Sequence, residues 1–226
     1  CSSDLVSLHR ASFVPVIHEE RLVLFSGEDG ALFFLGADGE EERFGFQFSK
    51  PLLSPPSFDG KRVVFYPKDF EGTVYLTDMK GVVADGWPQS GGGISFCSPV
   101  FHRDRRGNLF VVFLTQAGRL NVWNTDGSLR EGFPVELSGT HYVTPAVMNS
   151  AILSTEGKGR DALLTLDAGG IVRLISLDGQ ELKRKAVFDG SDKKARFILF
   201  DVDGDGVEEM FVYGIRNEIL GLGRNF

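Results

Sequence analysis

One ten-residue sequence pattern, called the frame below, occurs four times in this chain and restricts its fold more than any other feature. The copies are Gly30–Gly39, Gly72–Gly81, Gly118–Gly127 and Gly170–Gly179, and their starts lie 42, 46 and 52 residues apart. Each copy opens on Gly, carries apolar residues at its third and fifth positions, and closes on Gly, mostly as Asp-Gly. This alternation predicts a half-buried strand followed by a tight turn. A spacing in the forties indicates a repeat architecture.

Further strands are predicted around each frame. An apolar run comes before it, and the two together read as a β-hairpin; the runs are Arg21–Phe25, Arg62–Tyr66, Leu109–Leu114 and Ala162–Leu166. Upstream lies a proline-marked strand, since proline cannot donate to a sheet and marks a strand's start or edge; these segments are Val14–Ile17, Ser54–Phe58, Ser98–Phe101 and Thr144–Val147. An aromatic-proline pair, Trp87-Pro88 or Phe133-Pro134, comes before an outer strand. Four strands per repeat of this length predict a propeller blade.

The two ends of the chain predict how such a ring closes. Phe197–Phe200, Met210–Tyr213 and Asn217–Leu222 read as three strands of a last repeat, and Leu5–Leu8 reads as its fourth. A terminal strand that completes the last blade removes the open end of the array. We therefore predict an all-β fold with almost no helix, a single β-propeller domain over residues 1–226. Its five four-stranded blades span about 11–49, 50–93, 94–139, 140–190, and 191–226 plus 5–10. The alternative is a fragment of a larger propeller with further blades.

Charge and cysteine content limit the partners. The formal net charge is −7, which argues against nucleic acid because such a partner needs a basic face. Two cysteines, Cys1 and Cys97, are too few for a disulfide framework. Cys97 has no histidine beside it in the sequence, which favours a small buried residue over a nucleophile. The longest apolar run, Leu109–Leu114, is far shorter than a membrane span of roughly 20 residues.

The first residues resemble the mature end of a bacterial lipoprotein. The chain begins at Cys1, followed by the small polar residues Ser2, Ser3 and Asp4. In bacterial lipoproteins a signal peptide is removed just before a cysteine that is then acylated. The resemblance implies export to the bacterial periplasm, outer membrane or cell surface, with Cys1 as lipid anchor and residues 1–4 as tether. An incidental terminal cysteine is the competing interpretation.

One acidic loop predicts a metal site. The segment Asp201–Glu209 reads DVDGDGVEE and places carboxylates at alternate positions between glycines. Carboxylates that converge in this way repel one another unless a cation lies between them, and hard oxygen ligands select Ca²⁺. The predicted ligands are the side chains of Asp201, Asp203, Asp205 and Glu209 and the main-chain carbonyl of Val207. The competing interpretation is a solvated acidic turn.

This loop, together with the repeated frame and the Gly-aromatic-Pro pairs, resembles the FG-GAP and VCBS-type repeats of integrin-like or PQQ-like propellers. In that family the calcium loop joins the first two strands of a blade, where Asp201–Glu209 also falls. The resemblance implies a propeller with a structural calcium ion. The other four links between first and second strands lack the Asp triplet, so we expect one calcium ion at most.

The remaining candidates favour binding over catalysis. His9, His18, His102 and His141 have no ligand-like spacing, although His18 and His102 follow proline-marked strands and could meet at a channel mouth. Trp87 is expected to pack between sheets, with exposed sugar stacking as the alternative. The predicted inner strands carry no acid before Asp201, whereas a glycosidase needs paired carboxylates. We therefore expect a non-enzymatic scaffold that binds a protein in an envelope or surface complex. A carbohydrate-binding or carbohydrate-active propeller, with a glycan partner, is the alternative.

Overall fold

The regular structure of this chain is β throughout. The computed structural model describes residues 13–18, 21–26, 31–36, 39–47, 52, 54–67, 69–104, 106–150, 160–188, 195–204, 208–213 and 219–221. Within these ranges there is no helix, and therefore none that is long and apolar enough to cross a membrane. The all-β prediction is confirmed.

The described strands form five antiparallel sheets in chain order. The first is β1 (Phe13–His18), β2 (Arg21–Ser26), β3 (Ala31–Gly36) and β4 (Glu41–Gln47), and the second is β5 (Ser57–Phe58), β6 (Arg62–Phe65), β7 (Thr73–Asp78) and β8 (Gln89–Ser90). The third is β9 (Val100–Arg103), β10 (Leu109–Leu114), β11 (Arg119–Asn124) and β12 (Val135–Glu136), and the fourth is β13 (Ala146–Ser150), β14 (Arg160–Leu166), β15 (Ile171–Ser176) and β16 (Glu181–Ala186). The fifth has three described strands, β17 (Arg196–Phe200), β18 (Glu209–Tyr213) and β19 (Ile219–Gly221).

The recurrent ten-residue frame supplies the third strand of each four-stranded sheet. These strands are β3, β7, β11 and β15, and each pairs with the strand before it, as the hairpin prediction requires. In the third sheet, for example, Val112 lies opposite Val122 and Leu114 lies opposite Leu120. The proline-marked segments form the first strands, β1, β5, β9 and β13, at the sheet edges. An edge tolerates a residue that has no N–H to donate.

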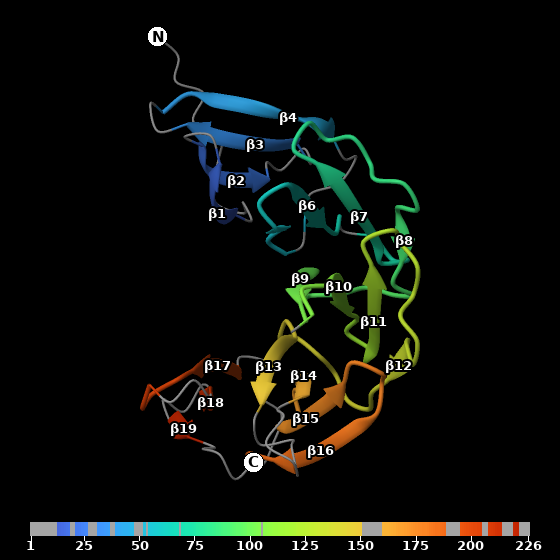
Figure 1. The fold of residues 1–226 in the computed structure, drawn as a ribbon, viewed down its shortest axis with the longest axis vertical. Coiled ribbons are helices and arrows are strands. Elements are labelled where there is room, and N and C mark those ends of the chain that lie inside the picture. The colour runs from blue at the N-terminus through green and yellow to red at the C-terminus, as the bar shows by residue number, and fades with distance from the viewer. Residues whose placement is uncertain are drawn as a thin grey trace.

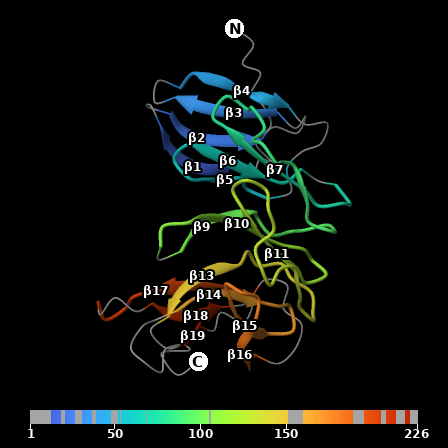
Figure 2. The same ribbon diagram turned by 45° about the vertical axis from the view of Figure 1, so that its right-hand side comes forward.

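The five sheets follow one another along an open arc, with β1–β4 at one end and β17–β19 at the other (Figures 1 and 2). Residues 5–10 lie outside the described residues, so the predicted closing strand is not tested. The number of blades and the domain limits also stay predictions.

The cores lie between neighbouring sheets, because the central strands bury both of their faces. On β10, Phe110, Val112 and Leu114 pack with Leu163 and Ile175 of the fourth sheet. Each of these five side chains is fully buried. The alternate residues of β10, Val111 and Phe113, pack instead in a cluster with residues of the second sheet and Trp123. Burial of one such side chain contributes about 1.5–3 kcal/mol, so neighbouring sheets stabilise one another.

Asp-Gly turns contact a glycine of the preceding sheet at two equivalent places. A Cβ added at Gly86 would overlap the Asp126 carbonyl oxygen, and one added at Gly132 would overlap the Asp178 carbonyl oxygen. Each glycine therefore lets its backbone touch the turn that ends the next copy of the frame. Beside the first contact, the Trp87 Nε1–H donates to the Thr125 carbonyl at 3.0 Å.

In the last sheet, β17 carries apolar residues on both of its faces. Its inner face places Phe197 and Leu199 against the core of the fourth sheet. On the opposite face, Ile198 and Phe200 are 52% and 62% exposed. Apolar residues on both faces of β17 are the pattern of a strand that lies between two sheets.

Candidate functional site

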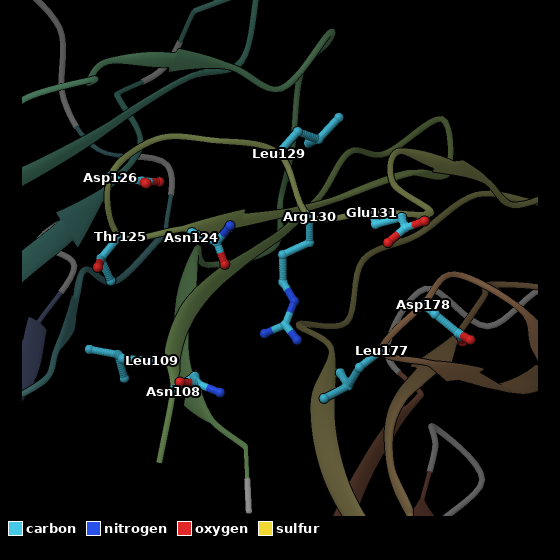
Figure 3. A pocket seen from close by; sticks show the side chains of 10 residues that line it. All are labelled: Asn108, Leu109, Asn124, Thr125, Asp126, Leu129, Arg130, Glu131, Leu177 and Asp178. Carbon is cyan, nitrogen blue, oxygen red and sulfur yellow. The ribbon is translucent and has the colours of Figure 1, made fainter. Parts of the chain in front are cut away.

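A cavity lies between the third and fourth sheets, on the side where three turns meet. It holds about 620 Å³, and the turns are those between β9 and β10, between β11 and β12, and between β15 and β16. Figure 3 shows the side chains that line it: Asn108, Leu109, Asn124, Thr125, Asp126, Leu129, Arg130, Glu131, Leu177 and Asp178. Loops on a rigid β scaffold often carry recognition residues, and here polar groups surround three leucines.

The turns around this cavity are held by their own hydrogen bonds. Asp104 Oδ1 accepts from the N–H groups of Arg106 and Asn108 at 3.0 and 2.9 Å. Asp126 Oδ1 accepts from the Ser128 N–H at 2.9 Å. Burial acts to raise the pKa of Asp104, but hydrogen bonds from Asn108 and Arg106 and the charge of Arg130 outweigh it and lower that pKa. The carboxylates therefore stay ionised and shape their loops.

The acidic loop joins β17 to β18, as predicted. Carboxylate oxygens of Asp201, Asp203 and Glu209 lie within 4.8 Å of one another. The Val202 N–H donates to Glu209 Oε2 at 2.9 Å, and the Gly204 N–H donates to Asp201 Oδ1 at 2.8 Å. Asp205 and Val207, the other two predicted ligands, lie outside the described residues, as does the anchor residue Cys1. Three converging carboxylates supply hard oxygen donors of the type that Ca²⁺ binds, so this part of the loop fits the ion.

A buried ion pair near the junction of the third and fourth sheets was not anticipated from the sequence. Arg173 Nη1 donates to Asp167 Oδ2 at 2.8 Å, and the two side chains are only 3% and 4% exposed. The second guanidinium nitrogen donates to Ser138 Oγ at 2.9 Å, which ties the pair to the segment after β12. Burial lowers the pKa of nearby His141; the charge of Asp167 opposes this and that of Arg173 adds to it. Arg173, Asp167 and His141 are buried, so this cluster contributes to the packing of the sheets.

Cys97 and Trp87 are core residues. Burial raises the pKa of the Cys97 thiol to about 12, despite a hydrogen bond with Ser95, and the thiol is free, so this residue is a small core residue as expected. Trp87 is 8% exposed and meets Trp123 edge-to-face at 5.8 Å, which confirms packing between sheets and rules out the sugar-stacking alternative. Burial lowers the pKa of His102 to about 4 and Pro145 opposes it only in part. The side chain of His18 lies outside the described residues, so the predicted histidine pair is not tested.

Comparison with known proteins shows likeness in fold alone. No protein-family model and no curated protein sequence matches the chain. Among solved structures, the WD40 β-propeller domain of Doa1 is similar over 93% of this chain and 63% of its own, with a TM-score of 0.56 and 17% identity. The computationally designed Ika8 protein is similar over 90% of this chain and 55% of its own, with a TM-score of 0.58 and 14% identity.

A third similar structure is Chaetomium thermophilum Raptor, which matches 93% of this chain and 18% of its own, with a TM-score of 0.63 and 14% identity. The chain thus spans between about half and two thirds of the length of Ika8 and of the Doa1 domain. Together with the sheets in chain order, these similarities place the chain in the β-propeller class of fold.

Proposed function

We propose that this chain is a non-enzymatic β-propeller scaffold that binds a protein partner at the cavity between the third and fourth sheets, where the turns around Arg130 meet. The observation that carries the proposal is the cavity of about 620 Å³, which is lined by turns of two sheets. Loops on a rigid framework are where recognition residues concentrate, and a cavity offers a partner side chain more contact than a flat surface does. The similar solved structures support the fold, and the cavity supports the function.

Site-specific photo-crosslinking in the cells that make the protein tests this function. A photoreactive phenylalanine analogue in place of Leu129, which is 42% exposed at the cavity, is expected to capture a defined protein. The same analogue in place of Lys185, which is exposed on β16 and outside the cavity lining, is the matched control. The proposal fails if position 129 captures no protein, or captures the same proteins as position 185.

The acidic loop binds one structural Ca²⁺ ion in this proposal, as its resemblance to FG-GAP and VCBS-type repeats implies. Asp201, Asp203 and Glu209 are the described ligands, and Asp205 and the Val207 carbonyl complete the set. Calcium at about 100 times its dissociation constant would raise the free energy of unfolding by about 2.7 kcal/mol. Calorimetry and calcium-dependent thermal unfolding should show this effect, and Asp203→Asn should abolish it. Asp85→Asn, an exposed change far along the chain, should leave it intact.

The chain is held at a bacterial envelope through an acylated Cys1, which is a further part of the proposal. Support comes from the sequence Cys1-Ser2-Ser3-Asp4. Stable anchoring needs more than one acyl chain, so intact mass spectrometry of the protein from native membranes should show the mass of several acyl chains on Cys1. An unmodified cysteine in that material would contradict the anchor.

The finer architecture that we propose closes the open arc into a ring of five blades, in which residues 5–10 form the fourth strand of the last sheet. Support comes from β17–β19, which has three described strands where each other sheet has four. Removal of residues 1–10 would then expose the edge of β19 and lower the stability of the whole chain. Denaturant unfolding at an unchanged midpoint would contradict the closing strand.

A further inference from the structure

Arg130 stands in the middle of the cavity on a backbone that is fixed on both sides. Its N–H donates to the Val122 carbonyl at 2.9 Å, and its own carbonyl accepts from the Phe133 N–H at 3.1 Å. The guanidinium carbon lies 4.8 Å from the centroid of the buried Phe110 ring. Figure 3 shows the side chain in the space between Asn108 and Leu177. A guanidinium that stacks on a buried ring is held in position before any ligand arrives.

The edge of this guanidinium keeps donors for a ligand. Among the described residues its ion-pair partner is Asp104, and the Nη2 to Oδ2 distance of 3.8 Å is too long for a hydrogen bond. Asp104 Oδ2 already accepts from Asn108 Nδ2 at 3.0 Å. The Arg130 side chain is 20% exposed, so a ligand can reach it. The planar fork of an arginine matches a carboxylate, which can accept two parallel hydrogen bonds from it.

The rim of the cavity has the opposite charge. Asp126, Glu131 and Asp178 are exposed there and, with Arg130, give the lining a formal charge of −2. Hydrogen bonds from Ser128 lower the pKa of Asp126, so that carboxylate is ionised at neutral pH. A simple anion would be repelled by this rim, whereas a ligand with positive charges beside its carboxylate would be attracted. The cavity's leucines can cover the aliphatic stems of lysine or arginine side chains.

We propose that this cavity binds an acidic side chain of the partner polypeptide that has lysine or arginine residues on both sides of it. The carboxylate pairs with Arg130, and the flanking cations pair with the acidic rim. This inference rests on the proposed function as a protein-binding scaffold, and it adds the chemistry of the segment that is recognised.

Fluorescence anisotropy with two labelled, end-blocked peptides tests the inference on the full chain. One peptide contains Gly-Lys-Glu-Lys-Gly, and its matched control contains Gly-Lys-Gln-Lys-Gly. Hydrogen bonds to a charged group contribute about 1.5–3 kcal/mol, so the Glu peptide should bind at least about tenfold more tightly than the Gln peptide. Equal affinities for the two peptides, or no binding of either at about millimolar protein, would overturn the proposal.

Variants assign the effect to Arg130. Arg130→Gln should remove the preference for the Glu peptide, and so should Arg130→Lys, which keeps the charge and loses the fork. Arg119→Gln is the matched control, because Arg119 lies outside the cavity and pairs with Glu136 at 2.6 Å; it should keep the preference. Circular dichroism shows whether each variant is folded, and the lysine variant decides if the glutamine variant is not. An unchanged preference in folded Arg130→Lys contradicts the role of Arg130.

Two further results separate this inference from the proposed function. If the photoreactive residue at position 129 captures a protein equally well with Arg130 and with the Arg130→Gln change, the scaffold function stands and the carboxylate recognition is wrong. If the peptides are distinguished but no protein is ever crosslinked, the recognition stands and the scaffold function falls. Replacement of both Glu131 and Asp178 by their amides should weaken the binding of both peptides and keep the preference for the Glu peptide. Loss of that preference would contradict the separate roles given to Arg130 and to the acidic rim.

Discussion

Replacement of Gly132 by alanine tests whether the close contact between sheets stabilises the array. Gly132 has a φ of +85°, and a Cβ there would overlap the Asp178 carbonyl of the next sheet. An alanine at a left-handed φ costs about 1–2 kcal/mol. The overlap adds about 1–3 kcal/mol, because the obstructing atom belongs to backbone and cannot rotate away. We therefore expect Gly132→Ala to lower the free energy of unfolding by about 2–5 kcal/mol.

Gly107 offers a matched control within the same protein. Its φ is +83°, nearly the same as that of Gly132, but a Cβ at Gly107 would meet no atom within 4 Å. Gly107→Ala should therefore lose only the backbone part, about 1–2 kcal/mol. Urea unfolding and thermal scans measure both, and for a chain of this size each kcal/mol corresponds to about 2–4 °C. Equal losses in the two variants would refute the contact between sheets as a source of stability.

Three further predictions follow from buried groups. The pKa of His102 is about 4 in the folded chain and about 6.5 in the unfolded chain, so protonation favours the unfolded chain. The stability that depends on neutral His102 is therefore complete above pH 6.5 and is lost as the pH falls toward 4, a loss of about 3 kcal/mol in the free energy of unfolding. His102→Leu should make the fall in stability over this pH range shallower by that amount in urea titrations, and an unchanged slope would contradict it. Asp167→Ala should cost about 3–5 kcal/mol because it removes the buried carboxylate at 2.8 Å and leaves the Arg173 guanidinium only the more exposed Glu181 at 3.6 Å as a charged partner. Asp167→Ala with Arg173→Leu should cost less than the two single changes combined, and additive losses by denaturant unfolding would argue against the pair. Trp87→Phe removes the donor to the Thr125 carbonyl and part of the packing, which should lower the melting temperature by several degrees, and no change would show that neither matters.

The strands could be predicted from the sequence because their signals are local. In the Gly118–Gly127 frame, period-two alternation and the closing Asp-Gly turn mark β11 directly. The apolar run before it coincides with β10. Both signals depend only on residues a few positions apart, and two strands joined by a short turn pair without any contact between residues distant in the sequence.

The candidate cavity could not be predicted, because its residues come from turns that look alike in the sequence. Arg130 follows a frame and reads as an ordinary solvated residue until the fold places Phe110 beneath it. The buried pair of Asp167 and Arg173 left a weak signal, since Arg173 is a charged residue between the apolar positions Val172 and Leu174. Its partner, however, is fixed only by the turn between β14 and β15.

The acidic loop shows the intermediate case. The spacing of Asp201 and Asp203 predicted convergence, and Glu209 joins them because it begins β18 directly opposite the end of β17, where Phe200 pairs with it. A regular alternation of carboxylates along one loop is readable from the sequence. Glu209 was also predicted as a ligand, and the register of β17 and β18 supplies the physical reason that it returns to the same point.

Because the cavity lies between two sheets, a ligand bound in it contacts both of them. Leu177 and Asp178 belong to the fourth sheet, whereas Arg130 and its neighbours belong to the third. A ligand that touches both walls would restrain the motion of one sheet relative to the next, and the close contact between Gly132 and Asp178 connects the same two sheets. Occupancy at this one joint would therefore be expected to slow amide exchange in both sheets, at positions that the ligand never touches.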